Sequence, residues 1–378
     1  MTVKLTMACL VLSSILSARQ VDYGEQFVSA GRELLRQGSF SQAEATFWTG
    51  MESTALNGAQ RLRLVANLNS VALMYRAAGR FRESEALFLK ILTLWARDRL
   101  PPDKYESTVL LGLAALYQSQ CKFSQAVTLH RRALRVWGKT VRKDDPEIAP
   151  TIANLASLLY RLRRYSEAEH SYRRALALQE TFLGQHHTDV AATLTNLASV
   201  YQAMARHREA EDLYREALNI RQIAQGSQHP DVATIFNNLA VLRAEQGRYQ
   251  EAEQMYRRAV AVLENVTAGS NPSLATTLSN LVQIQIIEGR YASAQQLNLA
   301  ALSVWERSVE SDHPSLLRCL VDQGLILRKM KRTSEAAAFE KRASTIRAKY
   351  GSDATSYSID VSLLQAPGKK RKQLAEGK

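Results

Sequence analysis

The sequence has few cysteines and no recognisable catalytic motif. Cys9, Cys121 and Cys319 are the only cysteines among 378 residues, so a disulfide framework is not expected and the redox compartment stays open. The sequence contains no nucleophile elbow, P-loop, Rossmann glycine pattern or metal-ligand motif. We therefore do not expect an enzyme, and we expect neither a cofactor nor a metal.

Long apolar runs are also missing, because none reaches the roughly 18 residues that a membrane-spanning helix needs. Residues 1–18 instead have the order of a secretory signal: Lys4, an apolar core over Leu5–Leu16, and Ala18 before a cleavage point. Leu16 departs from the small residue expected two positions earlier. A cleaved signal peptide predicts a secreted or periplasmic chain, whereas an uncleaved anchor or an unstructured start predicts a cytoplasmic one.

Acidic residues are outnumbered, with 36 Asp and Glu against 49 Lys and Arg, which gives a formal net charge of +13. Residues 354–378 are predicted to form a basic, disordered tail. The positive charge that remains outside this tail is explained either by a solvated surface or by an acidic partner.

A pattern that recurs every 42 residues dominates the chain, with copies that begin at Asp145, His187, His229, Asn271 and His313. In residues 229–270, the spacing of Ile235, Leu239 and Leu242 predicts one helix, and Ala252, Tyr256 and Ala259 predict a second. A single helix pair cannot bury both of its apolar faces, so stacked copies imply a solenoid. The eighth copy drifts towards polar residues, as an end repeat requires.

Local signals predict how these helices begin. The histidines that open the repeats, His187, His229 and His313, are expected to cap first helices. Ser41 with Glu44, and Ser166 with Glu169, have the spacing of a capping box at the start of second helices.

The family resemblance is carried by Asn238-Leu239-Ala240, by Gly247-Arg248-Tyr249, and by Glu251-Ala252-Glu253 with Tyr256-Arg257-Arg258-Ala259. They resemble the tetratricopeptide repeat (TPR), most closely the 42-residue variety of kinesin light chains. The resemblance implies an all-α fold, a right-handed TPR superhelix (α-solenoid) of about eight helix-turn-helix repeats. The repeats are predicted at residues 24–60, 61–102, 103–144, 145–186, 187–228, 229–270, 271–312 and 313–353.

The resemblance also implies that the first helix of each repeat lines a hollow inner face. One position on that face is asparagine in four successive repeats: Asn154, Asn196, Asn238 and Asn280. An amide both donates and accepts, so it can bond the backbone of an extended peptide, and kinesin-light-chain-type repeats use an asparagine ladder in this way. The alternative is that each asparagine bonds a neighbouring helix and only maintains the stack. Ser70, Gly112 and Asp322 interrupt the ladder.

Arg161 adds positive charge to the predicted peptide-binding face, which leads to the hypothesis of a partially acidic peptide with a carboxylate near this side chain. A second basic row occupies the turns between helices, at Arg80, Lys122, Arg164, Arg206, Arg248, Arg290 and Arg332. These residues are expected to be solvated, or to bond the carbonyls at a helix end. The alternative is a charged rail for nucleic acid.

We therefore predict a non-catalytic scaffold that binds a protein or peptide partner of unknown identity in the TPR groove. A purely structural or self-associating array is the first alternative. A nucleic-acid-binding repeat protein is the less expected second alternative, because the faces lack base-stacking aromatics.

Overall fold

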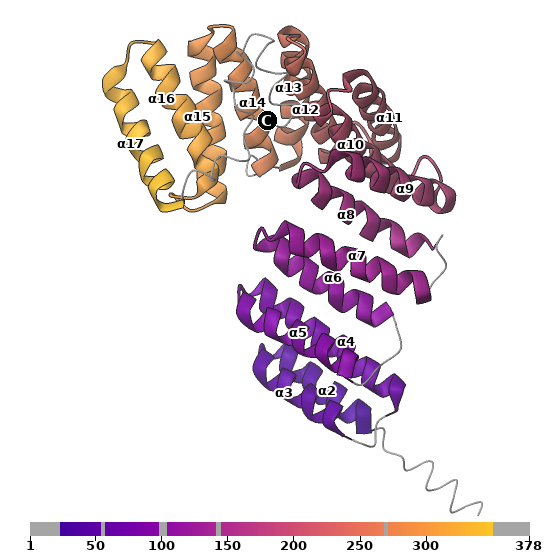
Figure 1. Ribbon diagram of the computed structural model, residues 1–378. Coiled ribbons are helices and arrows are strands. Elements are labelled where there is room, and N and C mark those ends of the chain that lie inside the picture. Colours follow the sequence, from indigo (N-terminus) through magenta and orange to yellow (C-terminus); the bar gives the residue numbers. More distant parts are fainter. Residues whose placement is uncertain (1–22, 54–56, 98–103, 141–144, 268–270, 351–378) are drawn as a thin grey trace, which may run out of the picture. The chain divides into compact units, whose positions relative to one another are not determined.

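The computed structural model describes residues 23–53, 57–97, 104–140, 145–267 and 271–350 (Figure 1). The predicted signal peptide and basic tail lie outside these residues. Within the described ranges the chain forms sixteen α-helices and no strand. The all-α repeat array predicted from the sequence is therefore confirmed.

The chain divides into two compact units, Met1–Arg164 and Tyr165–Lys378. The described helices of unit 1 are α2 (Tyr23–Arg36), α3 (Phe40–Glu52), α4 (Gly58–Ala77), α5 (Phe81–Arg97), α6 (Lys104–Ser119), α7 (Phe123–Thr140), the 3₁₀ turn η1 (Pro146–Ile148) and α8 (Ala149–Arg161). Those of unit 2 are α9 (Tyr165–Leu183), α10 (Thr188–Ala203), α11 (His207–Gln225), α12 (Pro230–Glu245), α13 (Tyr249–Thr267), α14 (Pro272–Ile287), α15 (Tyr291–Ser308), η2 (Pro314–Leu316), α16 (Leu317–Lys329) and α17 (Thr333–Tyr350).

Small residues let neighbouring helices approach closely. Ala198, Ala240 and Ala252 are fully buried, and the rings of Tyr214 and Tyr256 fill the space between helices. The first helices of unit 2 contact one another in succession, α10 with α12, α12 with α14 and α14 with α16. Each second helix also contacts the next first helix, so every repeat buries its apolar surface against its neighbour.

The turn from a first to a second helix has one geometry in all its described copies. A residue with positive φ is followed by a residue whose backbone N–H donates to the carbonyl five residues earlier, as in Gly79, then Arg80 N to Tyr75 O at 2.8 Å. This is the Schellman motif. The left-handed position is held by Gly38, Gly79, Cys121, Arg163, Ala205, Gly247, Gly289 and Lys331.

The predicted histidine caps are confirmed. The Nδ1 atoms of His187, His229 and His313 accept from the backbone N–H two residues later, at 3.1 to 3.2 Å. Each imidazole thus satisfies an N–H that the first helical turn leaves without an intrahelical partner.

The two predicted capping boxes are wrong. Helices α3 and α9 begin at Phe40 and Tyr165, so Ser41 and Ser166 already lie inside the first turn. The reason is that the Schellman turn brings the chain into the second helix earlier than a serine cap would. Glu44 is drawn instead towards the next repeat, where it accepts a hydrogen bond from the Tyr75 hydroxyl at 3.1 Å.

None of the helices in the described ranges is long and apolar enough to cross a membrane.

We predict that Ala205→Gly stabilises the protein. Ala205 has a φ of 59°, and the left-handed region costs a residue with a Cβ about 1 kcal/mol relative to glycine. The free energy of unfolding, measured by urea denaturation, should rise by about that amount. Ala177→Gly, inside α9, is the control and should lower it. A loss of stability in both variants would contradict this account.

Candidate functional site

The first helices of unit 2 carry a row of mostly polar residues at equivalent positions. We call it the first-helix face and define it by Asn196 and Ser199 of α10, Thr234, Asn238 and Val241 of α12, and Thr276 and Asn280 of α14. Helix α10 contacts α12, and α12 contacts α14. Three of the four ladder asparagines therefore lie on adjacent helices of one unit.

These three asparagines differ in burial and bonding. The Asn196 side chain is exposed and makes no hydrogen bond to any described residue. Asn238 is half-buried, and its Oδ1 accepts from Asn237 Nδ2 at 3.4 Å. Asn280 is 8% exposed and donates to Asn237 Oδ1 at 3.1 Å. Asn280 thus joins α14 to α12, whereas the Asn196 amide is open to a ligand.

Unit 1 holds the other two predicted site residues on α8. Asn154 and Arg161 are both exposed. The Arg161 guanidinium lies 5.4 Å from the centroid of the Phe123 ring, a cation–π contact that orients the side chain without neutralising it. An amide and a positive charge are therefore both accessible on this helix.

Steric crowding explains why the ladder is interrupted at Gly112. A Cβ at this position would lie 2.7 Å from the Phe88 ring and 3.2 Å from Asn69 Oδ1. No larger residue fits unless the aromatic ring moves, so an asparagine is excluded here by packing.

At the last ladder position, Asp322 serves the packing of α14 on α16. Its Oδ2 accepts a hydrogen bond from Gln283 Nε2 at 2.6 Å and lies 3.6 Å from Arg318 Nε. Burial raises the pKa of the Asp322 carboxyl to about 6, against the opposing effect of Arg318 and Gln283. The ladder position in this repeat is therefore a buried acid between two helices.

A set of glutamates that the sequence interpretation missed ties second helices to the next repeat. Glu253 of α13 accepts hydrogen bonds from Gln285 at 3.1 Å and from Arg290. Arg243 is similarly bonded to Glu211 at 2.8 Å. Hydrogen bonding from Arg290 holds the pKa of Glu253 below its usual range. We call these contacts the glutamate latches.

The latches recur through both units, and in one repeat both members are replaced together. Glu44 pairs with Tyr75, Glu85 with Tyr117, Glu169 with Tyr201 and Arg206, Glu211 with Arg243, and Glu253 with Gln285 and Arg290. Where valine replaces the glutamate, at Val127, leucine replaces its partner, at Leu159, and both are buried. This coupled change was the signal in the sequence that could have revealed the latches.

Five of the seven side chains in the basic row of the turns, those of Arg80, Arg206, Arg248, Arg290 and Arg332, form ion pairs rather than bonds to helix-end carbonyls. Arg80, Arg248 and Arg332 each bond the glutamate three residues later, at 2.6 to 2.9 Å, while Arg206 and Arg290 also reach latch glutamates. The carbonyls are satisfied by the backbone N–H groups of the same residues. Much of the row's charge is thus neutralised in place.

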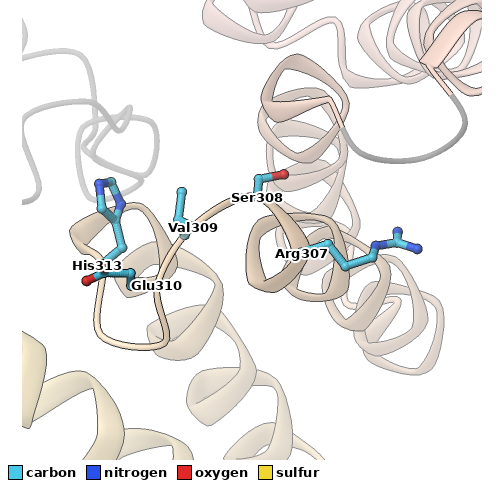
Figure 2. A pocket seen from close by; sticks show the side chains of 5 residues that line it. All are labelled: Arg307, Ser308, Val309, Glu310 and His313. Carbon is cyan, nitrogen blue, oxygen red and sulfur yellow. The ribbon is translucent and has the colours of Figure 1, made fainter. Parts of the chain in front are cut away.

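An open hollow beside the end of α15 does not form a convergent site. It is lined by Arg307, Ser308, Val309, Glu310 and His313, and Figure 2 shows Arg307 pointing away from the other four. His313 uses Nδ1 to cap η2. Among the described residues, no group of three or more His, Cys, Asp or Glu side chains could hold a metal ion.

Comparison with known proteins assigns the family. The tetratricopeptide repeat model matches residues 62–139, 147–223, 189–265 and 273–349, and the chain belongs to this family. No curated protein matches it.

Comparison with solved structures finds matches to the following proteins. The apo form of RapI is 13% identical, with coverage of 94% of this chain and 99% of RapI and a TM-score of 0.59. A Rap protein complexed with competence and sporulation factor is 15% identical, with 87% and 98% coverage and a TM-score of 0.53. TPR-like repeats of a Podosopora anserina putative kinesin light chain are 22% identical, with 55% and 99% coverage and a TM-score of 0.47.

We predict that Glu253→Gln lowers the free energy of unfolding by about 1 kcal/mol at neutral pH, because a charge-assisted latch becomes a neutral one. The pKa of Glu253 is lowered in the folded state, so its contribution is present above the unfolded pKa and is lost as the pH falls through the folded value. Urea denaturation of the wild-type protein and of Glu253→Gln, from neutral to acidic pH, measures the difference between their free energies of unfolding. Glu264→Gln, an exposed change on the same helix, should have no effect, and an equal loss there would contradict the latch.

We predict the opposite pH trend for Asp322. Its folded pKa of about 6 exceeds the ordinary value of 3.8, so the folded state binds the proton more tightly and stability falls as the pH rises through this window. Relative to Asp322→Asn, the wild-type protein should lose about 1 kcal/mol between about pH 5 and about pH 7.5. Thermal or urea unfolding at these two values tests the trend, and a pH-independent difference would refute it.

Proposed function

We propose that this chain is a non-catalytic scaffold that binds an extended peptide, or an extended segment of a partner protein, along the first-helix face. The observation that carries the proposal is the Asn196 amide, which is exposed on that face and bonds no described residue. Asn238, one repeat further, keeps an Nδ2 group that donates to no described atom. Two amides spaced along adjacent helices can each bond a peptide group.

The four ladder asparagines then divide into two roles. Asn196 and Asn238 bind the backbone of the ligand, whereas Asn280 positions α14 through Asn237. Asn154 and Arg161 form a separate contact in unit 1, where the exposed guanidinium favours a carboxylate on the ligand. Backbone bonds contribute affinity, and side-chain contacts such as the one at Arg161 contribute selectivity.

The family and the similar structures support a binding role. One of the similar structures is a Rap protein complexed with competence and sporulation factor, so a helical-repeat protein of this fold accommodates a bound factor. The apolar segment over residues 1–18 supports the further proposal that the chain is exported.

The nucleic-acid alternative is disfavoured by the ion pairs of the basic row. Arg206 and Arg290 each contact two carboxylates. A phosphate would have to displace these glutamates before it could use the guanidinium groups. A peptide on the first-helix face displaces no such pair at Asn196.

The test starts from a random-peptide library displayed on phage and selected on the immobilised wild-type protein. The enriched peptide is synthesised, and its binding is measured by fluorescence anisotropy. We predict that the double substitution Asn196→Ala and Asn238→Ala weakens binding about tenfold or more, equivalent to about 1.4 kcal/mol, with little change in Tm. Asn219→Ala, an exposed asparagine of α11, is the matched control and should bind as wild type.

Asn280→Ala separates the two roles. It should lower Tm more than it weakens peptide binding, because it leaves Asn237 without its inter-repeat donor. If the Asn196 and Asn238 variant instead loses stability and affinity in parallel, both residues hold the stack and the proposal fails. Failure to enrich any peptide would also overturn it.

A further inference from the structure

Positive charge is distributed unevenly between the two units. Residues 23–164 contain 21 Lys and Arg against 12 Asp and Glu, whereas residues 165–350 contain 21 against 20. The excess of the repeat array therefore belongs almost entirely to unit 1. A concentration of one sign of charge attracts partners of the other sign.

Within unit 1, helix α7 contains no acidic residue, although it carries Arg131, Arg132, Arg135 and Lys139. Every other second helix in the described ranges contains at least one glutamate. Helix α7 is thus the most basic second helix of unit 1.

Two replacements account for the missing acids on α7. Helix α11 has Glu209 and Glu211 in its first turns, where they pair with Arg206 and Arg215. The equivalent positions of α7 are held by Gln125 and by Val127, which is buried. The carboxylates that compensate arginines on α11 are therefore absent from this helix.

The four basic side chains share one exposed face of α7, which we call the basic α7 face. Arg131, Arg135 and Lys139 follow one another at intervals of four residues, or about 6 Å along the helix. All of them are exposed, as is Arg132. Ala126 and Ala133 lie on the opposite side and are fully buried, where α7 packs against α6. The basic α7 face therefore points away from the core.

The protein compensates these charges only in part. Arg132 pairs with Glu106 at 2.9 Å, yet its side chain stays 44% exposed. Arg135 and Lys139 form no ion pair with a described residue. Like charges four residues apart on a helix repel each other, and carboxylates of a partner would relieve that repulsion.

The dimensions of the basic α7 face fit a short acidic helix. From Arg131 to Lys139 it extends about 12 Å, and acidic residues at every fourth position of a partner helix have the same spacing of about 6 Å. Leu89 occupies the position equivalent to Arg131 on α5 and is 46% exposed. An amphipathic partner helix can cover this leucine with an apolar side chain, whereas a phosphate backbone gains nothing from it.

A nucleic acid would use a longer basic track, and unit 2 does not provide one. The residues equivalent to Arg131 there are Arg173, Arg215 and Arg257. Each of them pairs with the glutamate four residues earlier, at 2.6 to 3.0 Å.

We propose that the basic α7 face binds an acidic helix of a partner protein, with the partner's carboxylates on Arg131, Arg132, Arg135 and Lys139 and an apolar side chain on Leu89. The site lies on second helices, so the inference is independent of the proposed peptide binding along the first-helix face.

The probe is a fluorescent synthetic helix of about 20 residues that has glutamate at every fourth position of one face and leucine beside it. Anisotropy measures its binding to the full-length chain at about 0.15 M salt, where the Debye length is about 8 Å. Arg135→Glu with Lys139→Glu should weaken binding about tenfold or more with little change in Tm. The same variant should bind a probe with lysine in place of glutamate, which the wild-type protein does not bind.

Two control variants should bind the acidic probe as the wild-type protein does. Lys341→Glu with Arg347→Glu makes the same change in net charge at exposed positions of α17. Asn196→Ala with Asn238→Ala alters the first-helix face, so its unchanged affinity separates this site from the proposed function.

Four outcomes overturn the proposal. The first is no binding of the acidic probe by the wild-type protein. The second is equal affinity for a probe of the same composition with its glutamates spread around the helix, and the third is an equal loss in the α17 variant, since either would show attraction by net charge alone. The fourth is tighter binding of an oligothymidylate of about 20 nucleotides that is lost in the Arg135 and Lys139 variant, which would assign the face to nucleic acid.

Discussion

Each helix pair in this chain depends on its neighbours to bury its apolar faces. The alanines and tyrosines that fill the core lie between helices of adjacent repeats as well as within one pair, so no repeat has a complete core of its own. The Schellman turns make this stacking regular, since they set how each first helix leads into its second. Positions one repeat apart consequently have equivalent surroundings. A change of residue type at one of them therefore changes a specific contact between helices or with solvent.

Polar residues at these equivalent positions divide between binding and assembly. The latch glutamates and Asp322 lie at contacts between helices, where they accept hydrogen bonds from arginine, amide or tyrosine hydroxyl donors. Asn280 belongs with them, because its amide is used inside the protein. Asn196 has the same residue type at the same register, yet its amide faces solvent. The position of a residue in the repeat therefore does not by itself predict ligand binding. Whether its side chain already bonds another part of the protein must also be known.

Periodicity predicted the helices, their pairing and the capping histidines, because these depend on local spacing and on the geometry of the first turn. The spacing within one repeat did not reveal the latches, since Glu211 and Arg243 belong to adjacent repeats and meet only after these have stacked. The capping-box prediction failed at Ser41 and Ser166 for a related reason: the backbone geometry of the preceding turn determines where the helix begins. The different burial of Asn196 and Asn280 likewise follows from the side chains packed around each one, and the asparagine ladder alone does not predict it.

The proposed binding of a peptide to the first-helix face is tested most directly by finding which residues of unit 2 the bound peptide contacts. A photo-activatable amino acid can replace Ser199, on the first-helix face beside Asn196, or Asn219, which is exposed on α11. The account predicts that a selected peptide is cross-linked from position 199 and not from position 219. Cross-linking from position 219 alone would place the ligand on the second helices and contradict it.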